Sequence, residues 1–269
     1  MVVFPNCKIN LGLRILRKRA DGYHDLDTLF YPLPFCDALE IIPSSKLHFT
    51  STGLPIPGSA DNNLSLKAYG LLKTDFPDLP PIHIHLHKRI PIGAGLGGGS
   101  SDGAMMLMVL NRRFQLRLDE GKLREYAIKL GSDCPFFLVN SPCIGEGRGE
   151  ILRPVDLDLS GYSFVIVNPG LHFGTADAFA NCTPDERGRP VGEIIRNPID
   201  TWKKDLKNDF ETPLFRQYPL LRSIKEHLYS QGAVYASMTG SGSGIFGIFK
   251  KDKVPSLTFE RDYQVIPLT

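Results

Sequence analysis

The stretch from Pro91 to Ala104, PIGAGLGGGSSDGA, combines six glycines with two serines and is followed by an apolar run. Glycine is costly to order and is kept where the backbone bends sharply or approaches another group closely. Successive glycines free backbone N–H groups to point at one anion, and a helix predicted to start near Ser100 adds the positive end of its dipole. Hydroxyl groups of Ser100 and Ser101 add donors, and either could help to hold Mg²⁺. We therefore interpret the loop as a phosphate cradle, with a flexible surface loop as the alternative.

Two named glycine motifs fit this loop less well. Gly93, Gly95 and Gly98 match the GxGxxG spacing of dinucleotide-binding folds. A loop this rich in glycine meets that spacing by chance, and it lies mid-chain after several predicted strands. A Walker A loop needs lysine directly before serine, where this sequence has Gly99. An ordinary P-loop is therefore excluded, whereas a nicotinamide-dependent oxidoreductase remains an alternative.

Three further segments carry residues that could do chemistry. Alternation in CKINLGLRIL predicts a half-buried strand with Lys8 and Asn10 together on its other face. Asp133 follows a predicted helix end in GSDCPFF, a place that is also typical of a turn aspartate. A second glycine turn, TGSGSG, contains Gly240 and Gly242. Taken singly, an exposed strand lysine, a turn aspartate and a hairpin would explain all three.

Histidines and cysteines are the remaining candidates. His83, His85 and His87 alternate along IHIHLHK and share one strand face, but no nearby carboxylate or cysteine completes a zinc site. We therefore expect a half-buried strand there and no metal centre. The five cysteines are irregularly spaced and form no CxxC pair, which indicates free thiols in a reducing cytoplasm. Cys134 has no local partner that marks it as a nucleophile.

Composition narrows the class of protein. The 269 residues are 42% hydrophobic and 22% charged, which is ordinary for a globular protein. A net charge of only +2 gives no support for binding nucleic acid. The longest apolar run is too short to span a bilayer, and the N-terminus does not resemble a signal peptide. These features favour a cytoplasmic protein that has neither nucleic acid nor membrane as a partner.

Helices and strands mix in both halves of the chain, which indicates the α+β class with two subdomains. Helical spacing and capping residues predict helices at about 61–73, 100–113, 119–130, 175–181, 198–206 and 219–231. Alternating or short apolar runs predict strands at 38–42, 46–51, 82–88, 163–169, 233–238 and 245–250. The segments 135–139 (PFFLV) and 143–152 also read as extended.

The order of the motifs resembles the GHMP small-molecule kinase superfamily. An N-terminal P-x-x-K-x-N-L, a central P-x-G-x-G-L-G-G-G-S-S and a C-terminal G-S-G occur in that order. DGYHDLDTLF (Asp21–Phe30), AGLGGGSSD (Ala94–Asp102) and GSDCPFF (Gly131–Phe137) further resemble the member family that acts on a cytidine diphosphate-linked methylerythritol. DNNLSLKAY, GEGRGE and NDFE also fit that family, and the likeness covers about residues 5 to 250.

This resemblance implies a fold and a reaction. The fold would be a two-domain GHMP kinase fold, in which residues 1–154 form a domain like domain 2 of ribosomal protein S5. Residues 155–269 would form a ferredoxin-like domain, with the site between the two. ATP, with Mg²⁺, would phosphorylate the 2-hydroxyl of the methylerythritol moiety, a step of the non-mevalonate isoprenoid pathway. We expect small-molecule substrates as the partners of a monomer or weak homodimer.

The same resemblance assigns roles to individual residues. Asp133 would orient the attacking hydroxyl and accept its proton, and Lys8 would stabilise charge in a loose transition state. The triphosphate would bind along the glycine loop, at Pro91, Ile92, Gly93, Ala94, Gly95, Leu96, Gly97, Gly98, Gly99, Ser100 and Ser101. The erythritol hydroxyls, the cytosine base and the diphosphate region would be held by Asn10, Tyr23, His24, Thr175, Phe179, Gly240 and Gly242.

The sequence departs from the family pattern at a few positions. Cys7 and Cys134 stand where alanine and valine are common, and Gly103 replaces an alanine, which should weaken the loop helix slightly. The usual last helix is hard to find after Lys250, and Pro255 argues against a long one. None of these departures removes a reacting group.

Two other functions remain open within the same resemblance. A kinase acting on homoserine or mevalonate is the runner-up, although such kinases have no cytosine to hold with a DGYHDL segment. A non-catalytic nucleotide-binding protein would not need the lysine of the first motif or the aspartate of GSDCPFF. Both residues are present in this chain.

Overall fold

The computed structural model describes residues 1–259 and 263–268, and the chain divides into two compact units. The first unit comprises Met1–Lys8, Pro32–Ile92 and Gly97–Ser141. The second comprises Ile9–Tyr31, Gly93–Leu96 and the chain from Pro142 onward. The chain therefore passes between the units several times. The domain boundary expected after residue 154 stays a prediction.

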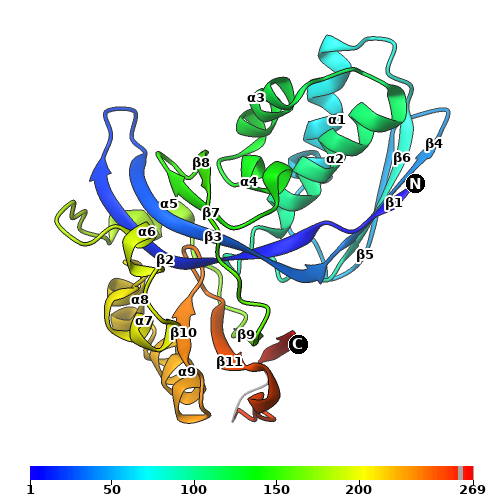
Figure 1. Cartoon of the computed structure of the whole chain (residues 1–269). Coiled ribbons are helices and arrows are strands. Elements are labelled where there is room, and N and C mark those ends of the chain that lie inside the picture. Colours follow the sequence, from blue (N-terminus) through cyan, green and yellow to red (C-terminus); the bar gives the residue numbers. More distant parts are fainter. Residues whose placement is uncertain (260–262, 269) are drawn as a thin grey trace. The chain divides into compact units, whose positions relative to one another are not determined.

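The first unit combines a four-stranded sheet with four α-helices (Figure 1). Strand β6 pairs antiparallel with β4 and parallel with β5, and β1 pairs with the outer edge of β4. The strands are β1 (Val2–Val3), β4 (Ala38–Pro43), β5 (His48–Gly53) and β6 (Ile82–Lys88). After the 3-10 helix η1 (Ala60–Asn62), the helices are α1 (Leu64–Asp75), α2 (Gly98–Phe114), α3 (Glu120–Leu130) and α4 (Cys134–Val139).

Alternation and capping explain why these segments fold as they do. Ile82, Ile84 and Leu86 of β6 are completely buried and alternate with the histidines, as the period of a strand requires. The side chains of Asn63 and Asp119 accept backbone N–H bonds at the starts of α1 and α3. The predicted helices and strands of this unit are therefore confirmed, apart from the segment 135–139.

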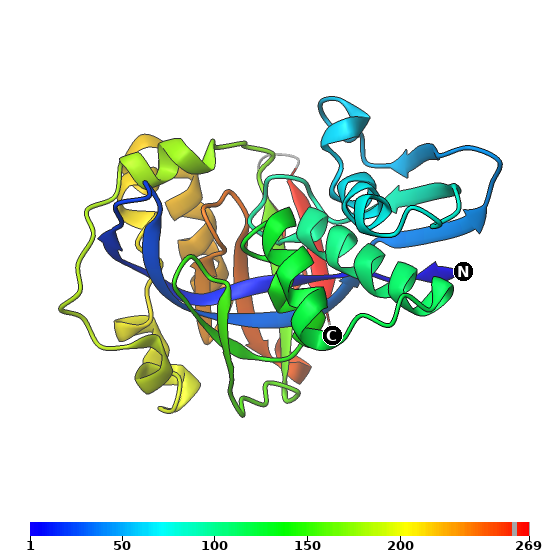
Figure 2. The same ribbon diagram turned by 90° about the horizontal axis from the view of Figure 1, so that it is seen from above.

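A second sheet is built around two long strands, β2 (Asn6–Lys18) and β3 (His24–Cys36). The sheet order is β2-β3-β7-β8, completed by β7 (Cys143–Glu146) and β8 (Ile151–Pro154). Figure 2 shows β2 and β3 as the long blue strands. The start of β2 belongs to the first unit and the rest to the second, so one strand carries Lys8 in one unit and Asn10 in the other.

The C-terminal part of the second unit is a four-stranded antiparallel sheet in the order β10-β11-β9-β12. Its strands are β9 (Tyr162–Asn168), β10 (Tyr235–Met238), β11 (Ile245–Lys250) and β12 (Gln264–Leu268). This order, with helices between β9 and β10, matches the first four elements of a ferredoxin-like βαββαβ unit and the position of its last strand. Between β11 and β12 the residues described up to 259 form only the 3-10 helix η3 (Lys251–Lys253), and β12 was not predicted.

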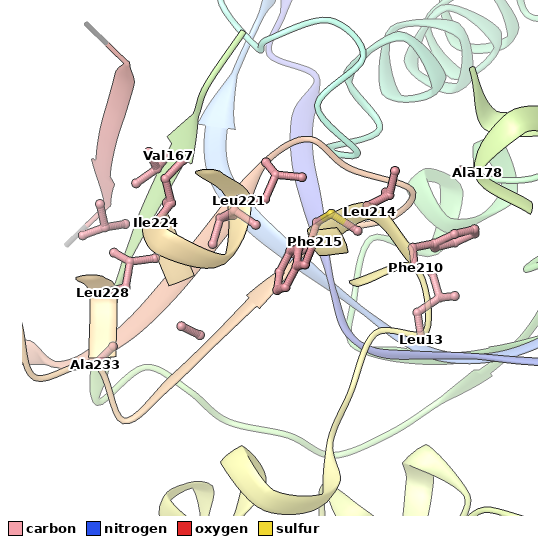
Figure 3. Close-up of a cluster of buried hydrophobic side chains, with 14 of the residues drawn as sticks. Leu13, Val167, Ala178, Phe210, Leu214, Phe215, Leu221, Ile224, Leu228 and Ala233 are labelled. Atoms are coloured by element: carbon pink, nitrogen blue, oxygen red, sulfur yellow. The ribbon is translucent and has the colours of Figure 1, made fainter. Parts of the chain in front are cut away.

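Several short helices of the second unit precede β10. They are α5 (Thr175–Ala180), α6 (Val191–Ile194), the 3-10 helix η2 (Ile199–Thr201), α7 (Trp202–Asp205), α8 (Glu211–Gln217) and α9 (Pro219–Ser230). Leu214 and Phe215 of α8 and Leu221, Ile224 and Leu228 of α9 join one buried apolar cluster with strand residues, as Figure 3 shows. This core fixes the strands that lead into the second glycine turn.

One expectation about local structure was wrong. The segment 135–139, expected to be extended, forms helix α4. A short apolar run does not by itself distinguish a strand from a buried helix, and Pro135 suits the first turn of a helix because its missing N–H would be unpaired there. Helix α8 was not predicted. Within the part of the chain that the structure describes, no helix combines the length and apolarity needed to cross a membrane.

Candidate active site

An ion pair in the first unit joins the two residues expected to react. Lys8 Nζ lies 3.2 Å from Asp133 Oδ2, and the side chains are 3% and 34% exposed respectively. Asp133 directly precedes α4 but makes no side-chain capping bond to that helix. A capping role therefore does not explain where its carboxylate lies. The buried ammonium is held in place, while the carboxylate remains accessible to a ligand.

Helix α2 starts next to this pair. Gly97 is its N-cap in a left-handed conformation, with φ 70°. A Cβ on Gly97 would lie 2.9 Å from Phe137 Cζ and 3.1 Å from Lys8 Cε, so only glycine fits there without displacement. The first N–H groups of a helix lack partners within the helix and favour anions. The lysine and the start of α2 thus bring two sources of positive potential together within the first unit.

The serines at the start of α2 have different surroundings. Ser101 is buried, and its Oγ has no hydrogen-bond partner among the described residues. Ser100 is half-buried. Burial raises the pKa of the Cys134 thiol to about 12, so the thiol stays protonated near neutral pH and is not a nucleophile. All five cysteines are free, as the sequence indicated.

Lys88, Asp37 and Asp102 form a buried cluster of charges that holds the chain on both sides of the glycine loop. This cluster was not predicted from the sequence. Lys88 Nζ binds Asp37 and lies 2.8 Å from Asp102 Oδ2 in α2. Asp37 Oδ1 also accepts the N–H groups of Arg89 and Ile90, at 2.6 and 2.8 Å. The Asp37 carboxylate therefore holds the backbone just before the loop. Lys88 links Asp37 to Asp102 in α2, the helix that follows the loop.

The middle of the loop, Gly93–Leu96, belongs to the second unit and contacts other residues. Gly95 has φ 75°, and a Cβ there would lie 2.0 Å from the Thr239 carbonyl oxygen. A Cβ on Gly240 would meet the Gly95 Cα at 3.1 Å. The two glycine segments predicted from sequence are thus in backbone contact. A Cβ on Gly93 would lie 2.6 Å from His172 Nδ1, a residue that sequence reasoning did not select.

Asn10 sits in a fully buried hydrogen-bond network of the second unit. Its Nδ2 donates to Thr28 Oγ1 at 2.9 Å, and that hydroxyl donates to the Gly12 carbonyl at 2.5 Å. Because the Thr28 proton is used in this way, Asn10 must present Nδ2 to Thr28 and Oδ1 to the other side. On that side Thr239 Oγ1 lies 3.4 Å from Asn10 Oδ1 and accepts the Asn10 N–H at 3.1 Å.

The second glycine turn is held by Asn208, the first residue of NDFE. Its Nδ2 donates to the carbonyl oxygens of Met238 and Gly240, at 2.8 and 2.9 Å, and its Oδ1 accepts the Phe210 N–H at 3.0 Å. A Cβ on Gly242 would lie 2.9 Å from Met238 Sδ. One buried amide therefore fixes the backbone of this turn, which gives the NDFE segment a physical role.

The aromatic residues expected to hold a base form a stack in the second unit. The His24 and Phe179 rings lie 4.8 Å apart and nearly parallel, at 11°. Phe210 meets Phe179 edge-on at 4.9 Å. Burial lowers the pKa of His24, which favours its neutral form. The ring of Tyr23 is instead paired with the Arg148 guanidinium, which lies 4.8 Å from its centre.

The surroundings of the remaining predicted site residues give less information about their roles. Pro91 is buried and Ile92 is half-buried in the first unit, while Ala94 and Leu96 are buried in the second. Thr175 is the exposed first residue of α5 in the second unit. Its exposure leaves the side chain accessible to a ligand.

The histidines of β6 form a hydrogen-bonded ladder with β5. Thr50 Oγ1 lies 2.8 Å from both His83 Nε2 and His85 Nδ1. Thr52 Oγ1 lies 3.1 Å from His85 Nε2 and 2.9 Å from His87 Nδ1. Their ring nitrogens thus bind threonine hydroxyls. Across residues 1–259 and 263–268, no group of three histidine, cysteine or acidic side chains is arranged to hold a metal ion.

Comparison with known proteins agrees with this arrangement. Residues 63–141 match the family model for the GHMP kinases N-terminal domain, and residues 191–258 match that for the GHMP kinases C-terminal domain. A Bacteroides fragilis protein named 4-diphosphocytidyl-2-C-methyl-D-erythritol kinase is 51% identical over 265 residues, covering 97% of this chain and 96% of that protein.

Two solved structures are also similar. A crystal structure of 4-(cytidine 5'-diphospho)-2C-methyl-D-erythritol kinase is 34% identical with a TM-score of 0.80, covering 92% of this chain and 90% of that one. A homoserine kinase from Cytophaga hutchinsonii has a TM-score of 0.66 at 15% identity, covering 98% and 95% of the two chains. At that identity the second likeness concerns the fold alone. The α+β class and the two-part kinase fold are thereby confirmed.

Proposed function

Because this chain belongs to the GHMP kinases, and within them to the family of 4-diphosphocytidyl-2-C-methyl-D-erythritol kinases, we propose that it transfers the γ-phosphoryl group of ATP to the 2-hydroxyl of that cytidine substrate. The products are ADP and the 2-phosphate, in a step of the non-mevalonate isoprenoid pathway. The observation that carries the mechanism is the pairing of Lys8 with Asp133 beside the start of α2.

The glycine loop binds the triphosphate in this proposal. The N–H groups at the start of α2 and the left-handed glycines Gly93, Gly95 and Gly97 provide donors without side chains in the way. A Cβ on Gly99 would meet nothing within 4 Å, so this position is open to a ligand. The anchoring of Asp102 to Lys88 keeps the loop rigid, which lowers the entropy cost of binding.

Asp133 and Lys8 perform the chemistry in this proposal. Phosphoryl transfer has a loose transition state, so positioning and charge stabilisation contribute most of the acceleration. The Asp133 carboxylate accepts a hydrogen bond from the substrate hydroxyl, orients it in line, and takes its proton late in the reaction. Lys8 holds Asp133 in place, and its ammonium offsets the negative charge on the transferred group.

Specificity for the alcohol substrate comes from the second unit in this proposal. Asn10 presents its Oδ1 on the side away from Thr28 and holds erythritol hydroxyls. The neutral His24 provides hydrogen bonding for cytosine, its stacked pair with Phe179 provides one aromatic surface, and Tyr23 adds a second. The backbone of Gly240 and Gly242 approaches the diphosphate region.

Mg²⁺ accompanies ATP in this proposal, and the residues present fit it. Mg²⁺ prefers hard oxygen donors and keeps several waters. The unpartnered hydroxyl of Ser101, with the neighbouring Ser100 hydroxyl, supplies such donors at the start of the loop helix. When bound, the ion screens the charge of the triphosphate.

Turnover with competing alcohols tests the proposal. ADP release is measured with the cytidine substrate, homoserine and mevalonate at equal concentrations. We expect turnover with the cytidine substrate to exceed that with the other two by several orders of magnitude. Comparable or faster turnover with homoserine or mevalonate would support the runner-up kinase. NADH binding without ATP turnover would instead support an oxidoreductase.

A further inference from the structure

Thr239 lies where the substrate-binding asparagine meets the phosphate loop. It is completely buried, just after β10, and its side chain was not selected by sequence reasoning. Its Oγ1 lies 3.1 Å from the Gly95 carbonyl oxygen and 3.4 Å from Asn10 Oδ1. It also accepts the Asn10 N–H at 3.1 Å. All of these residues belong to the second unit.

One hydroxyl cannot serve both acceptors fully. Threonine has a single O–H donor, whereas the Gly95 carbonyl and the Asn10 side-chain oxygen are both acceptors. The orientation of the Asn10 amide is fixed because Thr28 already donates to Gly12 and must accept from Asn10 Nδ2. The Thr239 proton is therefore divided between the phosphate loop and the substrate-binding side chain.

The hydrogen bond to Gly95 controls a loop donor. A peptide unit is planar and trans, so the Leu96 N–H points opposite to the Gly95 carbonyl. When the Thr239 hydroxyl holds that carbonyl, the Leu96 N–H is fixed on the side away from Thr239. Gly95 tolerates no side chain because a Cβ would collide with the Thr239 carbonyl. The orientation of this peptide thus depends on Thr239.

We propose that Thr239 is a positioning residue that couples binding of the alcohol substrate to binding of ATP. A substrate hydroxyl that donates to Asn10 Oδ1 replaces Thr239 as the donor to that oxygen. The Thr239 hydroxyl then donates fully to Gly95 and fixes the Leu96 N–H for the triphosphate. This inference rests on the proposed function, because it assumes that Asn10 binds the alcohol and that the loop binds ATP.

The expected coupling is modest, because it comes from strengthening one hydrogen bond. Such a bond corresponds to about a fivefold change in affinity. By linkage, saturating cytidine substrate should tighten binding of a non-hydrolysable ATP analogue about fivefold, and the analogue should tighten the substrate by the same factor. Titration calorimetry in the presence and absence of the other ligand measures both ratios.

Three variants separate coupling from simple damage to the fold. Thr239→Val keeps the shape but removes the hydroxyl, and the coupling ratio should fall to about one. Thr239→Ser keeps the hydroxyl and should keep the ratio. Ser237→Ala removes another completely buried hydroxyl of β10, which donates to Glu211 at 3.0 Å, and should also keep the ratio. Unchanged coupling in folded Thr239→Val, or lost coupling in Ser237→Ala, would overturn the proposal.

A measurement on the wild type keeps the inference testable if Thr239→Val does not fold. Cytidine diphosphate carries the base and phosphates but lacks the erythritol hydroxyls, so it should leave affinity for the ATP analogue unchanged. Equal tightening by cytidine diphosphate and by the full substrate would contradict the role of Asn10 and Thr239. Wild-type turnover of the cytidine substrate is scored separately, so absence of activity would count against the proposed function instead.

Discussion

The ammonium of Lys8 lies 3.2 Å from the carboxylate of Asp133, although the two residues come from the second strand and from the turn before the fourth helix. The lysine is almost completely buried and the carboxylate is one-third exposed. Such a pair is stabilised against movement while one member still faces a ligand. This asymmetry suits a lysine that stabilises charge and an aspartate that touches the reacting hydroxyl.

Asp133→Asn should therefore remove turnover while sparing nucleotide binding. Asparagine keeps the size of the side chain but cannot accept the proton, so kcat should fall by roughly 10²–10⁴. The affinity for a non-hydrolysable ATP analogue should change little. Steady-state kinetics and calorimetry measure the two effects, and Asp156→Asn serves as a control at an exposed aspartate.

Because Asp133 is paired with Lys8, a double variant tests whether the two side chains act together. If both residues act as one unit, Lys8→Met combined with Asp133→Asn should cost little more than the worse single change. Turnover near the wild-type level in Asp133→Asn would rule out the base assignment. Fully additive losses would show that the two side chains act independently.

Gly95 and Gly99 offer a contrast within one loop. Gly95→Ala requires an unfavourable left-handed conformation and places Cβ 2.0 Å from the Thr239 carbonyl, so it should destabilise the fold by about 1–3 kcal/mol or more. Gly99→Ala meets open space in a helical position and should leave stability equal or up to about 1 kcal/mol higher. Chemical denaturation measures both free energies of unfolding.

The affinity of Gly99→Ala for an ATP analogue tests whether the triphosphate binds at the start of α2. If the triphosphate approaches the start of α2, the added Cβ of Gly99→Ala should weaken binding of the ATP analogue although the fold is intact. A stable Gly99→Ala protein with unchanged affinity would place the triphosphate elsewhere. Equal stability of both alanine variants would contradict the packing seen around Gly95.

Phe179→Ala should weaken the cytidine substrate without affecting ATP. Stacking of a base on an aromatic ring contributes about 1–3 kcal/mol, which corresponds to roughly a fivefold to 150-fold rise in KM. Phe179→Tyr keeps the ring and should retain most of the affinity. Initial rates at varied concentrations of each substrate separate the two constants. A parallel rise in KM for ATP would indicate that the variant disturbs the whole second unit, since Phe179 also packs on Phe210.

Much of the fold was predictable because buried residues recur along the chain with the period of a strand or of a helix. The alternation of Ile82, Ile84 and Leu86 identified a strand, and Asp119 identified the start of a helix. The PFFLV segment was not predictable in this way, because a short run that is apolar throughout has no period. Strand β12 was also missed, since it is an edge strand whose pairing with β9 is not visible in its own sequence.

Residues of the candidate site were predictable where the residue type itself indicates the chemistry. They were not predictable where the role of a residue depends on a contact that only the structure shows. Lys8 and Asp133 stand in recognisable motifs, yet only the structure gives their 3.2 Å separation. The glycine at position 95 indicated that the backbone lies close to another group. Nothing in the sequence indicated that this group is Thr239. A buried threonine hydroxyl resembles any other threonine until its acceptors are known.

Asp102→Asn should change how stability depends on pH. The buried cluster of Lys88 with Asp37 and Asp102 carries one positive and two potentially negative charges. Burial raises the pKa of Asp102 to about 7, against the opposing effect of Lys88. An unfolded aspartate has a pKa near 3.9, so between about pH 4 and pH 7 the folded chain holds a proton that the unfolded chain has lost.

Ionisation of the buried Asp102 should lower the stability of the folded chain. Stability from this group is fully present below about pH 4 and is lost as pH rises through about 7, by up to about 1.4 kcal/mol per pH unit. The asparagine of Asp102→Asn still offers Lys88 an oxygen but does not titrate, so this variant should flatten the decline. Urea unfolding between pH 5 and pH 8 measures it, with Asp156→Asn as the exposed control. Equal slopes in Asp102→Asn and the wild type would mean that Asp102 stays ionised beside Lys88 throughout this range.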